Sequence, residues 1–270
     1  MSLATGRSQQ GVVGRLRLTF TTTFAVRAMK KLIKGLRQFQ SSYYCEHVDI
    51  FEQLAHGQAP RVLFITCSDS RVDPNLITQS QVGDIFVIRN AGNIIPPFGA
   101  TNGGEGAAVE YAIHALGIEH VVVCGHSNCG AMKGLLKMDK LEEDMPLVYD
   151  WLKHAETTRR LIKDNYADRP KEETIEIAIA ENVLTQLENL RTYPVIRSRI
   201  HQNRMTLHGW VYNIETGEVH AYDPVSHSYL PPQASLSTYD PDPDEMPPIH
   251  FPGAQWLSPQ QAERIYRGSS

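Results

Sequence analysis

The sequence predicts an α/β protein with a mainly parallel β-sheet, flanked by helices and extended by a C-terminal antiparallel hairpin. Three apolar runs, at residues 61–66, 84–89 and 120–125, have the length and β-branched content of strands. Segments with helical spacing of apolar residues separate these runs, and strands that alternate with helices form a parallel sheet. Two later strand-like segments, 206–214 and 218–222, flank a Glu-Thr-Gly turn and predict the hairpin.

Helices are predicted where apolar residues recur every three or four positions. Residues 29–44 show this spacing, and Asp73 followed by Pro74 is suited to cap and open a short helix. Another helix is predicted at residues 103–116. Its expected inward face carries Ala107, Ala108, Tyr111 and Ala115. Further helical patterns cover residues 131–138, 146–166, 172–190 and 194–201.

Charge divides the chain into a basic start and an acidic body. Residues 1–45 contain eight Lys or Arg and no Asp or Glu, which leaves 18 of the 26 basic residues and all 30 acidic residues to the body. With 18 positive against 30 negative side chains, residues 46–270 have a net charge of about −12. We expect residues 1–28 to be a basic, disordered extension. An acid-free start also fits a targeting peptide, and the residues leave this alternative open.

Length and composition fit a globular protein. A chain of 270 residues with 41% hydrophobic residues can bury a sizeable core. No apolar run reaches the roughly eighteen residues of a membrane helix, so we expect no membrane span, and we also expect no nucleic-acid partner. Four cysteines are too few for a disulfide scaffold and favour a reducing compartment such as the cytoplasm. Cys124 lies inside an apolar run and is expected to be a buried, unreactive residue.

Three residues at the ends of two predicted strands have the chemistry of metal ligands. Cys67 directly follows one apolar run, and His126 and Cys129 follow another. In parallel sheets, ligands bind at the edge formed by the carboxyl ends of the strands. Two thiolates and one imidazole suit zinc, and three protein ligands leave the fourth tetrahedral position for water. The pattern therefore predicts one catalytic Zn²⁺ per chain, although an isolated His-x-x-Cys would more often be ordinary buried residues.

A base is predicted beside this site. Two thiolates cancel the formal charge of zinc, so the pKa of a bound water falls less than at a site with three histidines. Activity should then favour alkaline pH or need a neighbouring base. Asp69, two residues after Cys67, is the candidate, and Arg71 can hold its carboxylate in a bidentate pair. Asp69 and Arg71 would also fit an ordinary structural salt bridge.

Two other classes of protein use similar residues. Zinc alcohol dehydrogenases also bind zinc with two Cys and one His. They need a dinucleotide-binding fingerprint, and the glycines at residues 103–109 lack the third Gly and follow no clear strand. The non-enzymatic alternative is a scaffold protein with a structural zinc, and only the C-terminal tail supports it.

The segment Cys67-Ser-Asp-Ser-Arg, followed by His126-Ser-Asn-Cys-Gly, resembles the β-class carbonic anhydrases, and the similarity runs over residues 29–224. The resemblance implies a zinc-dependent lyase that reversibly hydrates CO2 to bicarbonate and a proton. It implies that Asp69 and Arg71 are catalytic and orient the attacking water. In some members this Asp instead binds zinc and closes the site. Phe64 stands where the bicarbonate-inhibited subclass has Trp, which favours the open, plant-type subclass.

The resemblance also carries over substrate-binding positions, in a pocket that lies at a dimer interface in this family. Gln58 would bind substrate, Phe86 and Tyr111 would line the CO2 pocket, and Gly130 would present its N–H group. Ala91 stands where plant-type members often have Val, which leaves the pocket volume open. From the residues alone, Gln58 equally fits a surface loop, and the two aromatic residues fit the core. The family implies a homodimer or a higher homo-oligomer.

Residues 225–270 differ in composition from the body. Pro, Ser and Asp are frequent up to residue 259 and predict a linker that buries little apolar surface. Residues 261–269 resemble the terminus of the cyanobacterial carboxysomal β-carbonic anhydrases. The resemblance implies that this peptide docks on the carboxysome scaffold protein, so that a cytoplasmic enzyme would supply CO2 to rubisco inside the carboxysome. A terminus without a partner fits the residues as well.

Overall fold

The chain forms two compact units in a computed structural model that describes the backbone of residues 19–232 and the side chains from residue 27 onward. The first unit ends at Gly57 and the second begins at Gln58. The first unit is helical within its described part, and no described helix of the chain is long and apolar enough to cross a membrane. Its helices are α1 (Thr19–Gln38), a π-helix (Phe39–Tyr43), α2 (Tyr44–Glu46) and α3 (Val48–Ala55).

The start of α1 differs from the predicted boundary at residue 28. Residues 19–28, expected in a disordered extension, are helical. No Gly or Pro occurs between residues 19 and 34, so a helix formed further on can extend toward the N-terminus at little cost. Apolar side chains of this unit remain exposed, among them Leu32 at 61% and Leu36 at 68%. Residues 1–18 lie outside the described residues.

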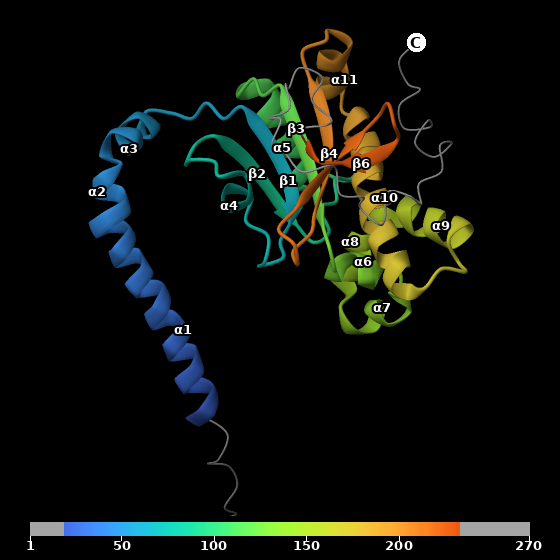
Figure 1. Ribbon diagram of the computed structural model, residues 1–270, viewed down its shortest axis with the longest axis horizontal. Coiled ribbons are helices and arrows are strands. Elements are labelled where there is room, and N and C mark those ends of the chain that lie inside the picture. Colours follow the sequence, from blue (N-terminus) through green and yellow to red (C-terminus); the bar gives the residue numbers. More distant parts are fainter. Residues whose placement is uncertain (1–18, 233–270) are drawn as a thin grey trace, which may run out of the picture. The chain divides into compact units, whose positions relative to one another are not determined.

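The second unit is built on a six-stranded sheet in the order β2-β1-β3-β4-β5-β6 (Figure 1). The first four strands of this order are parallel, and the last two pair antiparallel at one edge. This confirms the predicted mainly parallel sheet with an antiparallel C-terminal extension. The strands are β1 (Val62–Cys67), β2 (Ile85–Asn90), β3 (His120–His126), β4 (Thr206–Tyr212), β5 (Val219–Asp223) and β6 (Ser228–Leu230).

The long helix α10 (Lys171–Arg191) packs closely on β3 and β4. Two glycines on these strands allow the close approach, because a Cβ atom at Gly125 or at Gly209 would lie 2.9 Å from a methyl group of Val183. Val183 is fully buried and belongs to the main hydrophobic core. The helix is thereby fixed at short distance over the strand that ends at His126.

Helices connect the strands as predicted, with two differences. The pattern at residues 146–166 is interrupted by a 3₁₀ turn at Lys153–Ala155. The inward face predicted for residues 103–116 is only partly right. Ala108 packs against the core, but Tyr111 is 49% exposed, Ala107 and Ala115 are exposed, and Val109, Ala112 and Ile113 are buried instead. The larger β-branched side chains bury more apolar surface than the alanines do. The helices are α4 (Pro74–Thr78), α5 (Gly104–Glu110) with a π-helix (Tyr111–Ala115), α6 (Gly130–Leu135), a 3₁₀ turn (Met138–Lys140), α7 (Leu141–Asp144), α8 (Pro146–Leu152), α9 (Glu156–Asn165), α10 and α11 (Pro194–His201).

Strand β6 lies beyond residue 224, where the predicted body ends and the predicted linker begins. Its central residue, Tyr229, is fully buried, packs against Tyr222 and donates a hydrogen bond from its hydroxyl to the Ala180 carbonyl at 3.0 Å. Three residues are too few to show an alternating pattern of apolar and polar residues. The sequence therefore did not predict this strand. The rest of the predicted linker and the terminal peptide, residues 233–270, lie outside the described residues.

Candidate metal centre

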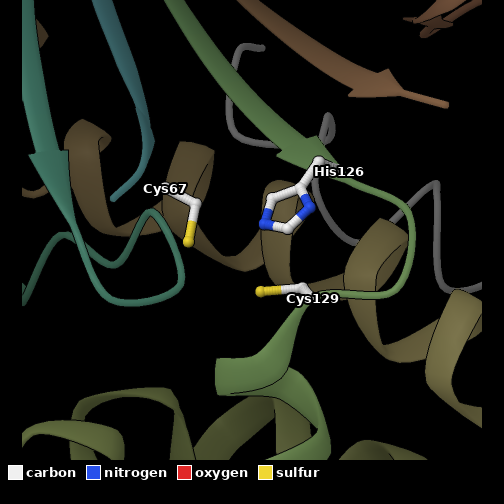
Figure 2. Close-up of side chains that lie close together, drawn as sticks. All are labelled: Cys67, His126 and Cys129. Atoms are coloured by element: carbon white, nitrogen blue, oxygen red, sulfur yellow. The ribbon is translucent and has the colours of Figure 1, made fainter. Parts of the chain in front are cut away.

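Cys67, His126 and Cys129 converge at the carboxyl ends of β1 and β3. Figure 2 shows the two sulfur atoms and the imidazole pointing toward one another from the end of β1, the end of β3 and the start of α6. One ligand atom from each residue lies within 4.8 Å of the others. All three side chains are buried, with 6%, 0% and 1% exposure respectively. Parallel strands in register bring about this meeting, because Cys67 and His126 each end a strand of the same sheet.

The orientation of His126 leaves one nitrogen for a ligand. Its Nδ1 lies 3.0 Å from the Ser127 carbonyl, to which it can donate a hydrogen bond. This fixes the tautomer in which Nε2 carries a lone pair. Nε2 is buried and has no hydrogen-bond partner within residues 27–232. A buried polar nitrogen without a partner is costly, and a metal ion beside two sulfur atoms would satisfy it.

The two thiols influence each other's pKa. A hydrogen bond from Cys129 lowers the pKa of Cys67 and outweighs the opposing effect of burial, with smaller lowering contributions from His126 and from the Gly92 amide. The pKa of Cys129 is raised, first by that same hydrogen bond and then by burial. Two adjacent buried thiolates repel each other, and a divalent cation between them removes this repulsion. Two sulfurs and an imidazole are therefore a set of donors that fits zinc.

Asp69 and Arg71 form a bidentate ion pair next to this cluster. Arg71 donates from Nε to Oδ1 at 2.9 Å and from Nη2 to Oδ2 at 2.8 Å, and its own amide N–H donates to Oδ1 at 3.0 Å. The Arg71 hydrogen bonds hold the pKa of the Asp69 carboxyl well below its usual range, so Asp69 is ionised at neutral pH. Asp69 Oδ2 also lies 3.9 Å from His126 Nε2.

Arg89 and Gly92 belong to the site although the sequence analysis did not assign them. Arg89 donates to the Cys67 carbonyl at 3.0 Å and to the Asp69 carbonyl at 2.8 Å, which fixes the turn that follows β1. The Gly92 N–H donates to Cys67 Sγ at 3.4 Å. Arg89 could have been found from the sequence, because it is a charged residue at the end of a strand that was predicted to be buried. A glycine two residues after the end of a strand was the signal for Gly92, whose φ is +84°.

The loop between His126 and Cys129 is held from α10. Asn128 has a φ of +58°, which Asn tolerates better than most residues, and its N–H donates to Glu176 Oε1 at 3.2 Å. Burial raises the pKa of Glu176. The Ser127 hydroxyl accepts from the Ile214 N–H at 3.0 Å, which ties the same loop to the residues after β4.

Cys124 does not join the cluster. It is fully buried in a small apolar group with Phe64 and Val122, separate from the main core. Burial raises the pKa of its thiol to about 12, so it stays protonated at any physiological pH. This confirms its predicted role as a buried apolar residue.

The predicted substrate-binding residues lie at two places. Gly130 is the first residue of α6 and is exposed, and Ala91 is exposed one residue before Gly92. Phe86 and Tyr111 contact each other with ring centroids 6.1 Å apart. They lie toward the other end of the sheet, because Phe86 is four positions before Asn90, the register partner of Cys67. This separation along the strand is about 13 Å.

Gln58 is also remote from the cluster of its own chain. It is exposed in the loop that precedes β1, whereas Cys67 is the last residue of that strand. The length of β1 alone separates these two positions by about 17 Å. Within one chain, Gln58, Phe86 and Tyr111 are therefore not assembled around Cys67.

A parallel α/β sheet that gathers Cys, His, Cys and an ionised Asp at its strand ends defines an enzyme with a candidate metal centre. Comparison with known proteins identifies the family. Residues 62–219 match the carbonic anhydrase family model. The chain is 56% identical to a carbonic anhydrase of Synechocystis sp. over 89% of this chain and 100% of that protein. It is 54% identical to a carbonic anhydrase of Synechococcus elongatus over 90% of this chain and 100% of that protein.

Solved structures agree with the sequence comparison. The structure of the β-carbonic anhydrase CcaA superposes with a TM-score of 0.76 and 65% identity, over 77% of this chain and 93% of that one. A tetrameric β-carbonic anhydrase from Sordaria macrospora matches with a TM-score of 0.61 and 29% identity, over 74% and 96%. The chain belongs to the carbonic anhydrase family, in its β class, and is an enzyme, a lyase.

Proposed function

We propose that the protein hydrates CO2 reversibly to bicarbonate and a proton, using one Zn²⁺ per chain held by Cys67, His126 and Cys129. The observation that carries the proposal is the buried His126 Nε2, which has no hydrogen-bond partner in the described part of the chain and faces two sulfur atoms within 4.8 Å. Zinc bound there would act as a Lewis acid that lowers the pKa of a water molecule.

Asp69 and Arg71 are the proposed catalytic pair. The ionised Asp69 carboxylate can accept a hydrogen bond from the attacking water and hold its lone pair toward the carbon of CO2. Arg71 occupies both carboxylate oxygens, which fixes the position of Asp69. Among the described residues, the group of candidate ligands contains Cys67, His126 and Cys129 and does not contain Asp69. This arrangement supports the open form of the site.

The CO2 pocket is proposed to be completed by a second copy of the chain. Phe86 and Tyr111 are too far from Cys67 of their own chain, yet Tyr111 is a large aromatic residue with 49% exposure. A twofold interface would place the same patch of each chain on the other. Gln58, Phe86 and Tyr111 of one protomer would then line the pocket of its partner.

Ala91 and Gly130 are proposed to line the near side of this pocket. A Cβ atom at Gly130 would meet nothing within 4 Å, so the space next to its amide is open for a small substrate. The Ala91 carbonyl accepts a hydrogen bond from the Trp151 indole at 2.8 Å, which fixes the backbone where the pocket wall would begin.

Mixing two inactive variants tests both the activity and the shared pocket. Gln58→Ala removes a substrate contact and Cys67→Ser removes the metal, and each pure variant should show little CO2 hydration by stopped flow. After mixing and reassociation, each heterodimer has one complete site, so activity should recover to about a quarter of wild type. Recovery requires that Gln58 act across the interface. No hydration by wild-type protein with zinc bound would contradict the proposed activity itself.

The cellular location is a separate proposal. We place the enzyme in the carboxysome, docked through residues 255–270 on the scaffold protein, where it would release CO2 beside rubisco. The resemblance of residues 261–269 to the carboxysomal enzymes supports this, as does their mix of apolar and charged side chains after a Pro-rich linker. Residues 255–270 fused to a fluorescent protein should form puncta in a cyanobacterium, and the truncated enzyme should be diffuse. A diffuse reporter together with a punctate truncated enzyme would exclude the tail as the targeting element.

A further inference from the structure

The segment at residues 91–98, which follows β2, has a buried middle part that belongs to no helix or strand. Residues 92–96 are all buried, although this stretch has only turns and irregular backbone. Buried N–H and C=O groups are paired in folded proteins, and here no strand or helix ladder supplies the partners. Side chains from elsewhere in the fold must supply them.

One face of α10 supplies several of these partners, while the Asn90 side chain pairs with both backbone groups of Ile94 and the Tyr193 hydroxyl donates to the Pro96 carbonyl. Asn182 donates from Nδ2 to the Gly92 carbonyl at 2.9 Å. Gln186 Oε1 accepts from the Ile95 N–H at 2.9 Å, and Asn189 Nδ2 donates to the Ile95 carbonyl at 2.9 Å. The three amides are spaced by four and three residues and so lie on one side of the helix. We call Asn182, Gln186 and Asn189 the amide ladder.

Hydrogen bonds within the amide ladder fix the orientation of each amide. Gln186 donates from Nε2 to Asn182 Oδ1 at 2.9 Å, and Asn189 donates from Nδ2 to Gln186 Oε1 at 3.1 Å. Asn182 and Gln186 are 1% and 0% exposed. Water therefore cannot replace a lost bond without rearrangement, and a change at one amide disturbs its neighbours.

The amide ladder is connected to the metal ligands through Gly92. The carbonyl of Gly92 is held by Asn182, and its N–H points at Cys67 Sγ. Gly92 is also closely packed, because a Cβ atom there would lie 3.0 Å from the side chains of Ala131 and Met132 in α6, the helix that begins directly after Cys129. The position of this one residue thus depends on α10 and determines a hydrogen bond to a proposed ligand.

We infer that the amide ladder positions the metal site: it holds residues 91–98 so that the Gly92 N–H donates to the Cys67 thiolate. The inference rests on the proposed zinc centre. A hydrogen bond to a metal-binding sulfur orients its lone pairs and tunes its donor strength, and partners outside the ligand shell commonly change metal affinity by about 10- to 100-fold. None of the three amides contacts substrate or the reacting atoms, so they are positioning residues.

If the amide ladder only stabilised the fold, its loss would lower stability without changing the metal site. A matched control for this alternative lies on α10. Thr185 lies on the same helix, is 5% exposed and accepts a hydrogen bond from Thr158 of α9 at 3.1 Å. Thr185→Val removes a buried hydrogen bond of α10 without touching residues 91–98. It should lower stability and leave the metal site unchanged.

The test compares Asn182→Ala, Asn189→Ala and Thr185→Val in the full-length protein. Zinc affinity is measured by competition with a chromophoric chelator, and the thiolate-to-metal charge-transfer bands are recorded after substitution with Co²⁺. We expect Asn182→Ala to weaken zinc binding by about 10-fold or more and to shift these bands. Asn189→Ala should do the same to a smaller extent, and it provides the readout if the fully buried Asn182 variant does not fold.

The Thr185→Val variant should bind zinc with an affinity within about twofold of wild type, and its cobalt charge-transfer bands should be unchanged. The inference is overturned if the asparagine variants that fold show the affinity and spectrum of Thr185→Val. Failure of the wild-type protein to bind zinc would instead overturn the proposed function, so the two failures are distinguishable.

Discussion

The Asp69 carboxylate lies 3.9 Å from the buried Nε2 of His126 while Arg71 holds both of its oxygens. This relationship places an ionised acceptor at the edge of the Cys67, His126 and Cys129 cluster. In the proposed mechanism, the site would combine three protein ligands with a base that is not itself a ligand.

Removing one sulfur should abolish both metal binding and activity. We expect Cys67→Ser and Cys129→Ser to purify with little zinc, because a serine hydroxyl is a weak zinc ligand at neutral pH. Cys124→Ala is the matched control, since Cys124 is equally buried but lies in another apolar group. It should retain zinc at the wild-type level. The measurement is the zinc content of each purified variant by atomic absorption. Full zinc occupancy in either serine variant would show that the metal site is elsewhere.

Asp69→Asn should keep zinc and lose about 100-fold or more of the hydration rate, because the amide cannot accept the water proton in the same way. Asp73→Asn makes the same chemical change nearby. Asp73 caps α4 through the Leu76 N–H at 3.2 Å, a role that Asn also fills, so this variant should be near wild type. A rate for Asp69→Asn within about twofold of wild type, which is about 0.4 kcal/mol of barrier, would reduce the pair to a structural salt bridge.

The pKa of Asp69 also predicts a pH dependence. A carboxyl with a lowered folded pKa contributes stability above its unfolded pKa, near 3.9, and loses it as the pH falls through the folded value. Asp69 therefore stays ionised from pH 6 to 9. The ratio of wild-type to Asp69→Asn activity should be constant over that range. A ratio that falls toward pH 6 would mean that Asp69 titrates there.

Thiol reactivity should distinguish the four cysteines. Cys45 is exposed, whereas Cys67, Cys124 and Cys129 are buried. In the zinc-loaded protein at pH 8, an aromatic disulfide reagent should react quickly with Cys45 alone, and Cys45→Ser should abolish that phase. All four should react after unfolding. Fast reaction of Cys124 in the native protein would contradict the pKa of about 12 that burial gives its thiol.

Two truncations should separate β6 from the tail. Deletion of residues 233–270 should leave the melting temperature and zinc content of the body unchanged. Deletion of residues 225–270 also removes Tyr229, a fully buried aromatic residue whose loss should cost about 3 kcal/mol or more. The longer deletion should therefore melt at a clearly lower temperature. Equal melting temperatures would show that β6 contributes nothing to the fold.

The sequence predicted the parts of this structure that depend on local pattern. Apolar runs marked β1 and β3, and the ends of these two runs placed Cys67 and His126 at one edge of the sheet. The side chains that act through backbone contacts were not predictable in this way. Asn182 and Gly92 are 90 positions apart and meet only when α10 has packed on the sheet. The inward face of residues 103–116 was predicted only in part because the spacing of the apolar residues fitted two faces, and packing selected the one with Val109 and Ile113.

The most direct test of the central claim is a titration of metal-free protein with Zn²⁺, followed by CO2 hydration in a stopped-flow instrument. The hydration rate should rise linearly and reach a plateau at one zinc per chain, and Cys67→Ser should stay inactive throughout. A metal-free protein that already hydrates CO2 at the plateau rate would contradict that claim.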